Sequence, residues 1–303
     1  MRRFFWKIIM HLLPRHGRWR NMVSSRIVKR TDNLWMFTPT IITHYKAKLT
    51  GPFSNVSLLC VGTSHVENAI NPEVMQIPTW NLGIRSGDLY TAYWLTKNTF
   101  MEGENKIIAL GYDFWLQGAQ TETSPMVGFS VLCNLLANVP LRSMFAIKPF
   151  IKEARMAIST NTLLPEHGSG GYFYHNGNYD NESIDPAKST PARAKAHLKT
   201  LTHQATEWIW LEKLQLLCEK RNARLVVFFP PSRADYRAFL PSKQILFGSF
   251  LNHFPEISLL DCFDDPDFIF EDFGDADHLN PHGAAKLSHK LETFIKALEP
   301  IRL

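Results

Sequence analysis

Short apolar runs separated by segments of helical periodicity constrain this chain more than any other feature of its sequence. Each run has the length and composition of a buried strand, and together they cover residues 56–61, 77–82, 106–110, 224–229 and 257–261. Helical spacing follows at Asp88 to Phe100, and Asn280-Pro281 is a favourable start for a helix that runs to about Leu298. Strands that alternate with helices favour parallel pairing. We therefore expect an α/β fold: a three-layer α/β/α sandwich around a central, mostly parallel five-stranded sheet.

The domain organisation follows from length and local composition. With 303 residues, of which 45% are hydrophobic, the chain can bury one large core. We predict a basic N-terminal extension over residues 1–50 and a single α/β domain over 51–303, with a helical and loop insertion at about 120–190. After the insertion, one long helix is expected from Pro191 to Asn222.

The positive charge of the chain is concentrated at its N-terminus. Nine of the 33 Lys and Arg lie in residues 1–31, which contain no acid, and this leaves 24 basic residues against 28 acidic ones in the remainder. A nucleic-acid-binding domain carries its positive charge on the folded surface that meets phosphate. The charge distribution therefore predicts no nucleic-acid partner.

The N-terminal segment also contains a short apolar run, Phe4 to Leu13. It is too short to span a bilayer and lacks a cleavage site typical of a signal peptide. Flanked by arginines, it either docks peripherally on an anionic membrane or packs as a helix against the domain. We expect a cytoplasmic or peripherally membrane-associated protein, and the sequence leaves the oligomeric state open.

The cysteines predict no cofactor or disulfide framework. Four are present, and they are scattered without a C-x-x-C pair: Cys60, Cys133, Cys218 and Cys262. Reduced thiols are the expected state, and neither a cofactor nor a metal is predicted.

A hydroxyl lies at the turn that follows the first predicted strand. Gly62-Thr-Ser64 connects that strand to a helix, and ligands of open parallel sheets bind beyond the carboxyl ends of the strands. Ser64 is thus placed to meet a substrate as a nucleophile. The alternative is structural, because Ser64 and Glu67 have the spacing of a capping box.

The segment GDADHLNPHG, residues 274–283, is the second candidate. His278 can accept the proton of Ser64, and Asp275 can orient the imidazole, as in a catalytic triad. The alternatives are a metal site that also uses Asp277 and His282, or a loop whose acids only cap. Such a metal site would make the protein a metal-dependent hydrolase.

The order of these features along the sheet resembles the SGNH (GDSL-like) hydrolase superfamily. Its four blocks carry a nucleophilic Ser, an oxyanion Gly, an oxyanion Asn and Asp-x-x-His, of which Ser64, Gly83 and Asp275/His278 match here. The resemblance covers about Val56 to Leu298. The segments GTSHVENAINPE, LGYDFW and DADHLNPHGA look most like relatives that modify cell-surface polysaccharides, of the alginate acetylation and lipoteichoic D-alanylation type. The resemblance implies an SGNH/flavodoxin-like sheet.

The chain departs from the family pattern at the oxyanion Asn, where Asp113 lies in the corresponding region. The resemblance implies that the backbone N–H groups of Ser64 and Gly83 bind the oxyanion, with Asn81 as the substitute third donor. An ionised Asp113 facing the site would oppose that charge.

Five residues are candidates for substrate binding. Arg85 and Arg233 follow two strands and would bind an acidic sugar, or pair with surface acids instead. Tyr174 and His175 lie in an aromatic loop that stacks on sugar rings or folds back to pack. Asp113 completes the set.

The resemblance implies a serine esterase or O-acyltransferase that acts on acyl groups, such as acetyl, of a cell-surface glycan or another acylated small molecule. Ser64 would form an acyl intermediate. Water as the second nucleophile gives an esterase, and a sugar hydroxyl gives a transferase. The alternative is a non-catalytic glycan-binding or assembly protein on the same fold.

Overall fold

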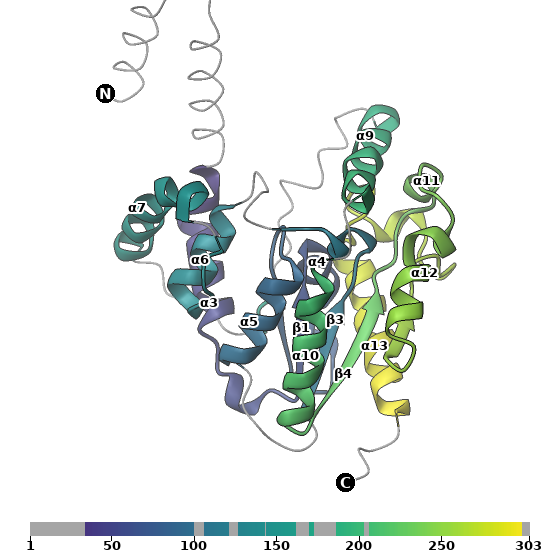
Figure 1. Ribbon diagram of the computed structural model, residues 1–303, viewed down its shortest axis with the longest axis horizontal. Helices are drawn as coiled ribbons and strands as arrows, with labels where there is room; N and C mark the ends of the chain where they lie inside the picture. Colours follow the sequence, from purple (N-terminus) through teal and green to yellow (C-terminus); the bar gives the residue numbers. More distant parts are fainter. Residues whose placement is uncertain are drawn as a thin grey trace, which may run out of the picture.

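The fold is an α/β sandwich around a five-stranded sheet (Figure 1). The computed structural model describes residues 34–99, 106–120, 127–142, 144–161, 170–172, 186–202 and 206–298. All strands are parallel in the order β2-β1-β3-β4-β5, and they comprise β1 (Leu58–Gly62), β2 (Thr79–Gly83), β3 (Lys106–Gly111), β4 (Ala223–Phe229) and β5 (Ser258–Asp261). The predicted fold class is confirmed, because each strand lies within two residues of its predicted start.

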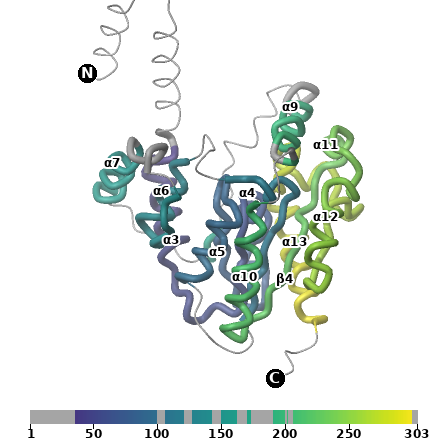
Figure 2. Tube along the Cα trace, in the orientation of Figure 1, coloured from purple at the N-terminus to yellow at the C-terminus, as the bar shows by residue number. Residues whose placement is uncertain are grey.

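Helices cover both faces of the sheet, as the Cα trace in Figure 2 shows. The α-helices are α3 (Pro39–Leu49), α4 (Ser64–Ala69), α5 (Leu89–Thr99), α6 (Gly128–Ala137), α7 (Met144–Thr160), α9 (Pro186–Leu198), α10 (Trp208–Lys220), α11 (Ala234–Arg237), α12 (Lys243–His253) and α13 (Pro281–Ala297). Short 3-10 helices connect them: η1 (Leu34–Phe37), η2 (Phe53–Asn55), η3 (Pro72–Val74), η4 (Phe114–Gln117), η6 (Lys199–Thr202) and η7 (Phe270–Asp272).

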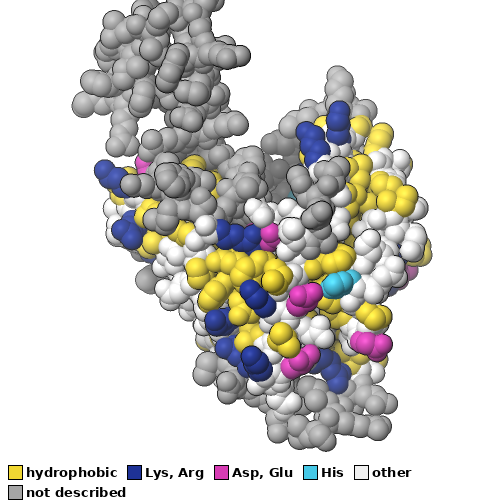
Figure 3. Space-filling view, in the orientation of Figure 1, with side chains coloured by type: hydrophobic (Ala, Val, Ile, Leu, Met, Phe, Trp, Pro, Cys, Tyr) yellow, Lys and Arg dark blue, Asp and Glu magenta, His cyan; other side chains and the backbone are white. Residues whose placement is uncertain are grey.

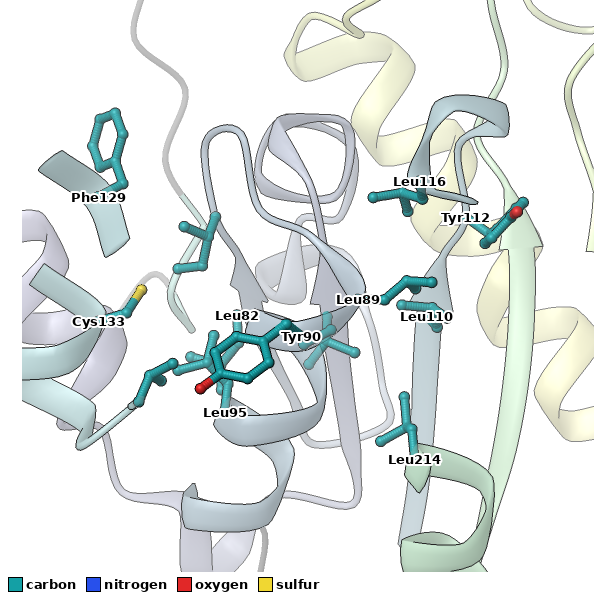
Figure 4. Packing of buried hydrophobic residues seen from close by; sticks show 14 of the residues in the cluster. Leu82, Leu89, Tyr90, Leu95, Leu110, Tyr112, Leu116, Phe129, Cys133 and Leu214 are labelled. Carbon is teal, nitrogen blue, oxygen red and sulfur yellow. The ribbon is translucent and has the colours of Figure 1, made fainter. Parts of the chain in front are cut away.

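Alternate residues of the strands enter two separate hydrophobic layers. Leu59 and Val61 of β1 face the layer that includes α5 and α10, shown in Figure 4, whereas Leu58 and Cys60 face α4 and α13. This alternation follows from the period of two along a strand. Because both faces are covered by helices, the strands are apolar throughout, as is typical of parallel sheets.

Residues 36–49, which the sequence analysis placed in the N-terminal extension, pack into the domain core. Met36, Ile42 and Tyr45 are fully buried in the layer that holds α5 and α10. The Tyr45 ring stacks on that of Phe129 in α6 at 5.0 Å. Residues 1–33, which include the segment predicted to touch a membrane, lie outside the described residues. Among the described helices, none is long and apolar enough to cross a bilayer.

The long helix predicted from Pro191 to Asn222 is instead two helices, α9 and α10. They pack in different places: α9 contacts α11 at the carboxyl edge of the sheet, and α10 lies along β4 and α5 (Figure 1). One continuous helix could not bury both faces in these two places. The prediction was wrong because helical periodicity shows which face of a helix is apolar but not which element that face packs against.

Aromatic side chains on the outer face of α5 and α10 are covered by cations. Hydrophobic groups gather there with Lys and Arg among them (Figure 3). Lys97 Nζ lies 4.2 Å from the ring centre of Trp94, and Lys213 Nζ lies 4.0 Å from that of Trp210. These cation–π contacts account for aromatic rings at the surface.

Candidate active site

The turn between β1 and α4 presents Ser64 at the carboxyl edge of the sheet. Gly62 has a φ of +148°, and a Cβ there would lie 2.5 Å from Val66 Cγ2, so the turn needs glycine. Thr63 is the N-cap of α4, because its hydroxyl accepts the N–H of His65 at 3.1 Å. The structural alternative of a Ser64/Glu67 capping box is therefore wrong. Ser64 is the first residue of the helix, and its hydroxyl is left for another partner.

That partner is His278, 214 residues further along the chain. Ser64 Oγ lies 2.8 Å from His278 Nε2, and His278 Nδ1 lies 2.9 Å from Asp275 Oδ2. The loop before α13 fixes the carboxylate, since Asp275 Oδ1 accepts the backbone N–H groups of Asp277 and His278 at 3.1 and 2.8 Å. The structure thus brings together the three residues predicted as a triad, in the order and at the distances that such a relay requires.

Burial and neighbouring charges set the protonation of this pair. Burial opposes ionisation of Asp275, but His278 and Arg193 outweigh it and lower the pKa of the carboxyl. For His278, burial is the main cause of a lowered pKa; Asp275 and Asp277 oppose this effect, and His65 and Arg193 add to it. A neutral imidazole beside an ionised carboxylate is the state in which His278 can accept a proton from Ser64.

Sequence analysis missed His65, the neighbour of the candidate nucleophile. Its Nδ1 lies 3.2 Å from Asp113 Oδ2 and its Nε2 lies 3.2 Å from Asp277 Oδ2. Burial opposes a charge on His65, but the two carboxylates raise its pKa to about 10. The ring stacks on that of His278, with centroids 4.4 Å apart and planes inclined by 9°. A histidine directly after the serine is visible in the sequence, but nothing there predicts this stack.

Helix α9 contributes two further groups that sequence analysis missed. Arg193 forms ion pairs with Asp275, at 3.2 Å from Oδ2, and with Asp277, and its Nη2 lies 3.0 Å from His278 Nδ1. His197 stacks on the ring of Trp115 with centroids 4.0 Å apart. No pattern in the sequence around α9 distinguishes these residues from other basic residues of the same helix.

The predicted oxyanion donors Asn81 and Gly83 are used inside the fold, so this prediction is wrong for both. Asn81 Nδ2 donates to the carbonyl oxygens of Val66 and Ile70 at 2.8 and 2.7 Å. Asn81 Oδ1 accepts the Gly83 N–H at 2.8 Å. Asn81 therefore ties β2 to the end of α4. Of the predicted donors, the backbone N–H of Ser64 remains, as the first N–H of a helix, without a partner among the described residues.

The predicted substrate-binding residues have other partners. Arg85 is 4% exposed and pairs through Nε with Glu67 Oε2 at 3.0 Å in a buried cluster. Arg233 is 2% exposed and forms a bidentate pair with Asp235 at 2.7 and 2.9 Å. The prediction of surface cations that bind an acidic sugar is therefore wrong for both, because each is buried against a carboxylate.

Asp113 contacts the two residues on either side of Ser64. Its Oδ2 accepts the hydroxyl of Thr63 at 2.6 Å and lies 3.2 Å from His65 Nδ1. The carboxylate predicted to bind substrate is thus engaged by the turn that carries Ser64. Tyr174 and His175 lie outside the described residues.

The four residues of the alternative metal site do not converge on one point. His282 pairs with Asp272 Oδ1 at 2.6 Å and is largely exposed, away from His278. A different trio, His65, Asp277 and His278, places its ligand atoms within 4.8 Å of one another. Their ring nitrogens already face Asp113, Asp277, Asp275 and Ser64, so a cation would have to displace these contacts.

Comparisons with known proteins are sparse. No family model and no curated protein matches the chain. Among solved structures, one similar chain is provisionally described as a platelet activating factor from Streptococcus pneumonia; it shares 12% identity, with 90% of this chain and 99% of that chain covered and a TM-score of 0.43. A likeness of this size carries no functional argument, so function must be inferred from the geometry of the site.

Proposed function

We propose that the protein is a serine-dependent esterase or O-acyltransferase that works through an acyl-serine intermediate. The observation that carries the proposal is the continuous relay from Ser64 Oγ through His278 to Asp275, with distances of 2.8 and 2.9 Å. Its position supports the same conclusion, because the carboxyl edge of a parallel sheet is where such folds bind ligands.

The residues divide the chemistry as follows. Ser64 Oγ attacks the acyl carbonyl while its proton passes to His278 Nε2, and Asp275 holds the ring and stabilises the imidazolium that forms. The Ser64 N–H donates to the oxyanion of the tetrahedral intermediate. Collapse of that intermediate expels the alcohol, which takes the proton from His278. Water or a second hydroxyl then attacks the acyl-serine by the same steps, and the serine is released.

The acyl group and its carrier are proposed from the resemblance of the sequence segments to glycan-modifying SGNH relatives. The resemblance favours an acetyl ester of a cell-surface glycan as the substrate. Water as acceptor makes the protein an esterase, and a sugar hydroxyl makes it a transferase. The triad serves either reaction, because the second step differs only in which hydroxyl His278 deprotonates.

A matched pair of serine variants tests the proposal. Purified protein is incubated with p-nitrophenyl acetate, and p-nitrophenol release and the mass of the acyl-protein are measured. Ser64→Ala should abolish both, and Ser232→Ala should retain both. Ser232 is a suitable control because it follows β4 and is buried, with its Oγ donating to Phe263 O at 3.3 Å instead of to a histidine.

The internal use of Asn81 and Gly83 favours a second candidate, a non-catalytic glycan-binding protein on this fold. A site with one oxyanion donor loses about 10²–10³-fold in rate for each donor that is missing. The same assay separates the two candidates. Turnover by the parent protein that equals turnover by Ser64→Ala, with no acyl adduct on either, would contradict the enzyme and favour the binding protein.

A further inference from the structure

The charge and the orientation of His65 are fixed by groups from several elements. It is 5% exposed, and both of its ring nitrogens face carboxylate oxygens, of Asp113 on one side and Asp277 on the other. A carboxylate oxygen at ion-pair distance from each ring nitrogen favours the charged form of the imidazole. His65 is therefore an imidazolium cation, anchored at its two ends.

The cation lies face to face with the ring that does the proton transfer. The His65 and His278 centroids are 4.4 Å apart and the planes are inclined by 9°, so the rings are stacked and do not meet edge to face. A cation is attracted to the face of a neutral aromatic ring. Two imidazolium rings in the same arrangement would repel each other, because like charges at short range disfavour the second ionisation.

Charged and titratable groups from two further elements also act on His278. From the loop before α13, Asp275 and Asp277 lie 2.9 and 3.4 Å from Nδ1 and favour a charged ring. From α9, Arg193 lies 3.0 Å from Nδ1 and opposes it. His197, also on α9, is neutral near pH 7, because burial lowers its pKa to about 4. His65, stacked on the His278 ring, therefore adds a second positive charge beside Arg193 that opposes ionisation of His278.

From this arrangement we infer that His65 is a positioning residue, which holds the His278 ring between Ser64 and Asp275 and keeps that ring uncharged until it accepts the proton of Ser64. Its consequence for turnover rests on the proposed function, whereas its effect on His278 does not. The stack fixes the plane of the ring, and the positive charge disfavours protonation of Nε2 before it accepts the serine proton.

Two substitutions separate the effect of the positive charge of His65 from the effect of its ring. His65→Gln removes the positive charge, and His65→Lys retains one between the same two carboxylates. NMR titration of the His278 ring should give a higher pKa in His65→Gln than in the parent protein, with His65→Lys close to the parent. His44→Gln is the matched control. His44 is also a buried histidine, 8% exposed, but it lies beside Glu67, so its replacement should leave the His278 titration in place.

The same variants have a kinetic readout. In His65→Gln the ratio of acyl turnover at pH 5.5 to that at pH 8 should fall about tenfold, since a one-unit displacement of the acid limb changes the fraction of neutral base by that factor. A His278 pKa in His65→Gln that equals or lies below that of the parent overturns the inference. So does an equal displacement in His65→Lys.

If neither variant folds, NMR titration of the His65 ring in the parent protein tests the inference. A His65 ring that stays protonated through pH 8 supports the inference, and one that loses its proton near pH 6.5 overturns it. The NMR measurement needs no turnover. A displaced His278 titration in a protein that never acylates Ser64 would therefore refute the proposed function and leave this inference standing.

Discussion

Replacing Thr63 by alanine should destabilise the protein far more than replacing Ser64, although both are hydroxyl residues at the start of α4. Thr63 is 3% exposed, and its hydroxyl has three contacts. It accepts the backbone N–H of His65 at 3.1 Å, donates to Asp113 Oδ2 at 2.6 Å and lies 3.3 Å from His65 Nδ1. The Ser64 hydroxyl contacts only His278, at 2.8 Å, among the described residues.

These contacts set the magnitudes. Loss of the cap costs about 1 kcal/mol, and loss of a hydrogen bond to a charged carboxylate costs a further ~1.5–3 kcal/mol. Thr63→Ala should therefore lower the free energy of unfolding by about 2–4 kcal/mol. Ser64→Ala loses one hydrogen bond worth about 0.5–1.5 kcal/mol and regains a few tenths from the better helix propensity of alanine, so its net cost is below about 1 kcal/mol.

Urea unfolding followed by tryptophan fluorescence measures both values, with the slope m unchanged if the variants unfold to the same state. Thr63→Ser is the control: it keeps the hydroxyl and loses one methyl, which costs about 1 kcal/mol. A Ser64→Ala variant that is destabilised as much as Thr63→Ala would refute the assignment of Thr63 as the cap. It would make Ser64 structural and remove the argument that its hydroxyl is free for chemistry.

Two other substitutions test the corrected roles of residues near the site. Gly83→Ala should lower both Tm and acyl turnover, because a Cβ there would lie 2.2 Å from the Glu67 backbone nitrogen and push α4 away; an unchanged Tm would contradict this packing. Arg85→Met should cost about 3 kcal/mol in urea unfolding by breaking the buried pair with Glu67, without changing KM for an anionic acyl ester. A raised KM would support the original prediction that Arg85 binds the substrate.

Helix α3 shows one limit of sequence analysis. The basic charge of residues 1–31 suggested an extension up to residue 50, yet Ile42 and Tyr45 are fully buried. The sequence of a short amphipathic segment beside a charged one does not show which element it packs against. Only packing against α6 shows that it belongs to the core.

Local sequence determined the sheet and singled out the three side chains that the structure brings into contact as Ser64, His278 and Asp275. The strands were predictable because a strand that is buried on both faces needs a continuous apolar run, and such a run is visible in consecutive residues of the sequence. Ser64, Asp275 and His278 were predictable because each lies just beyond or between such elements, and the carboxyl ends of parallel strands share one edge.

The partners of several polar side chains were decided only by tertiary structure. Whether Thr63 or Ser64 caps α4 depends on Asp113 and His278, which arrive from β3 and from the loop before α13. The buried pairing of Arg85 and the stacking of His65 on His278 likewise join segments that sequence spacing does not relate. A buried polar group must find a partner, and several partners are chemically equivalent. Packing of the core decides which of these partners lies within about 3 Å of the polar group and can form the hydrogen bond.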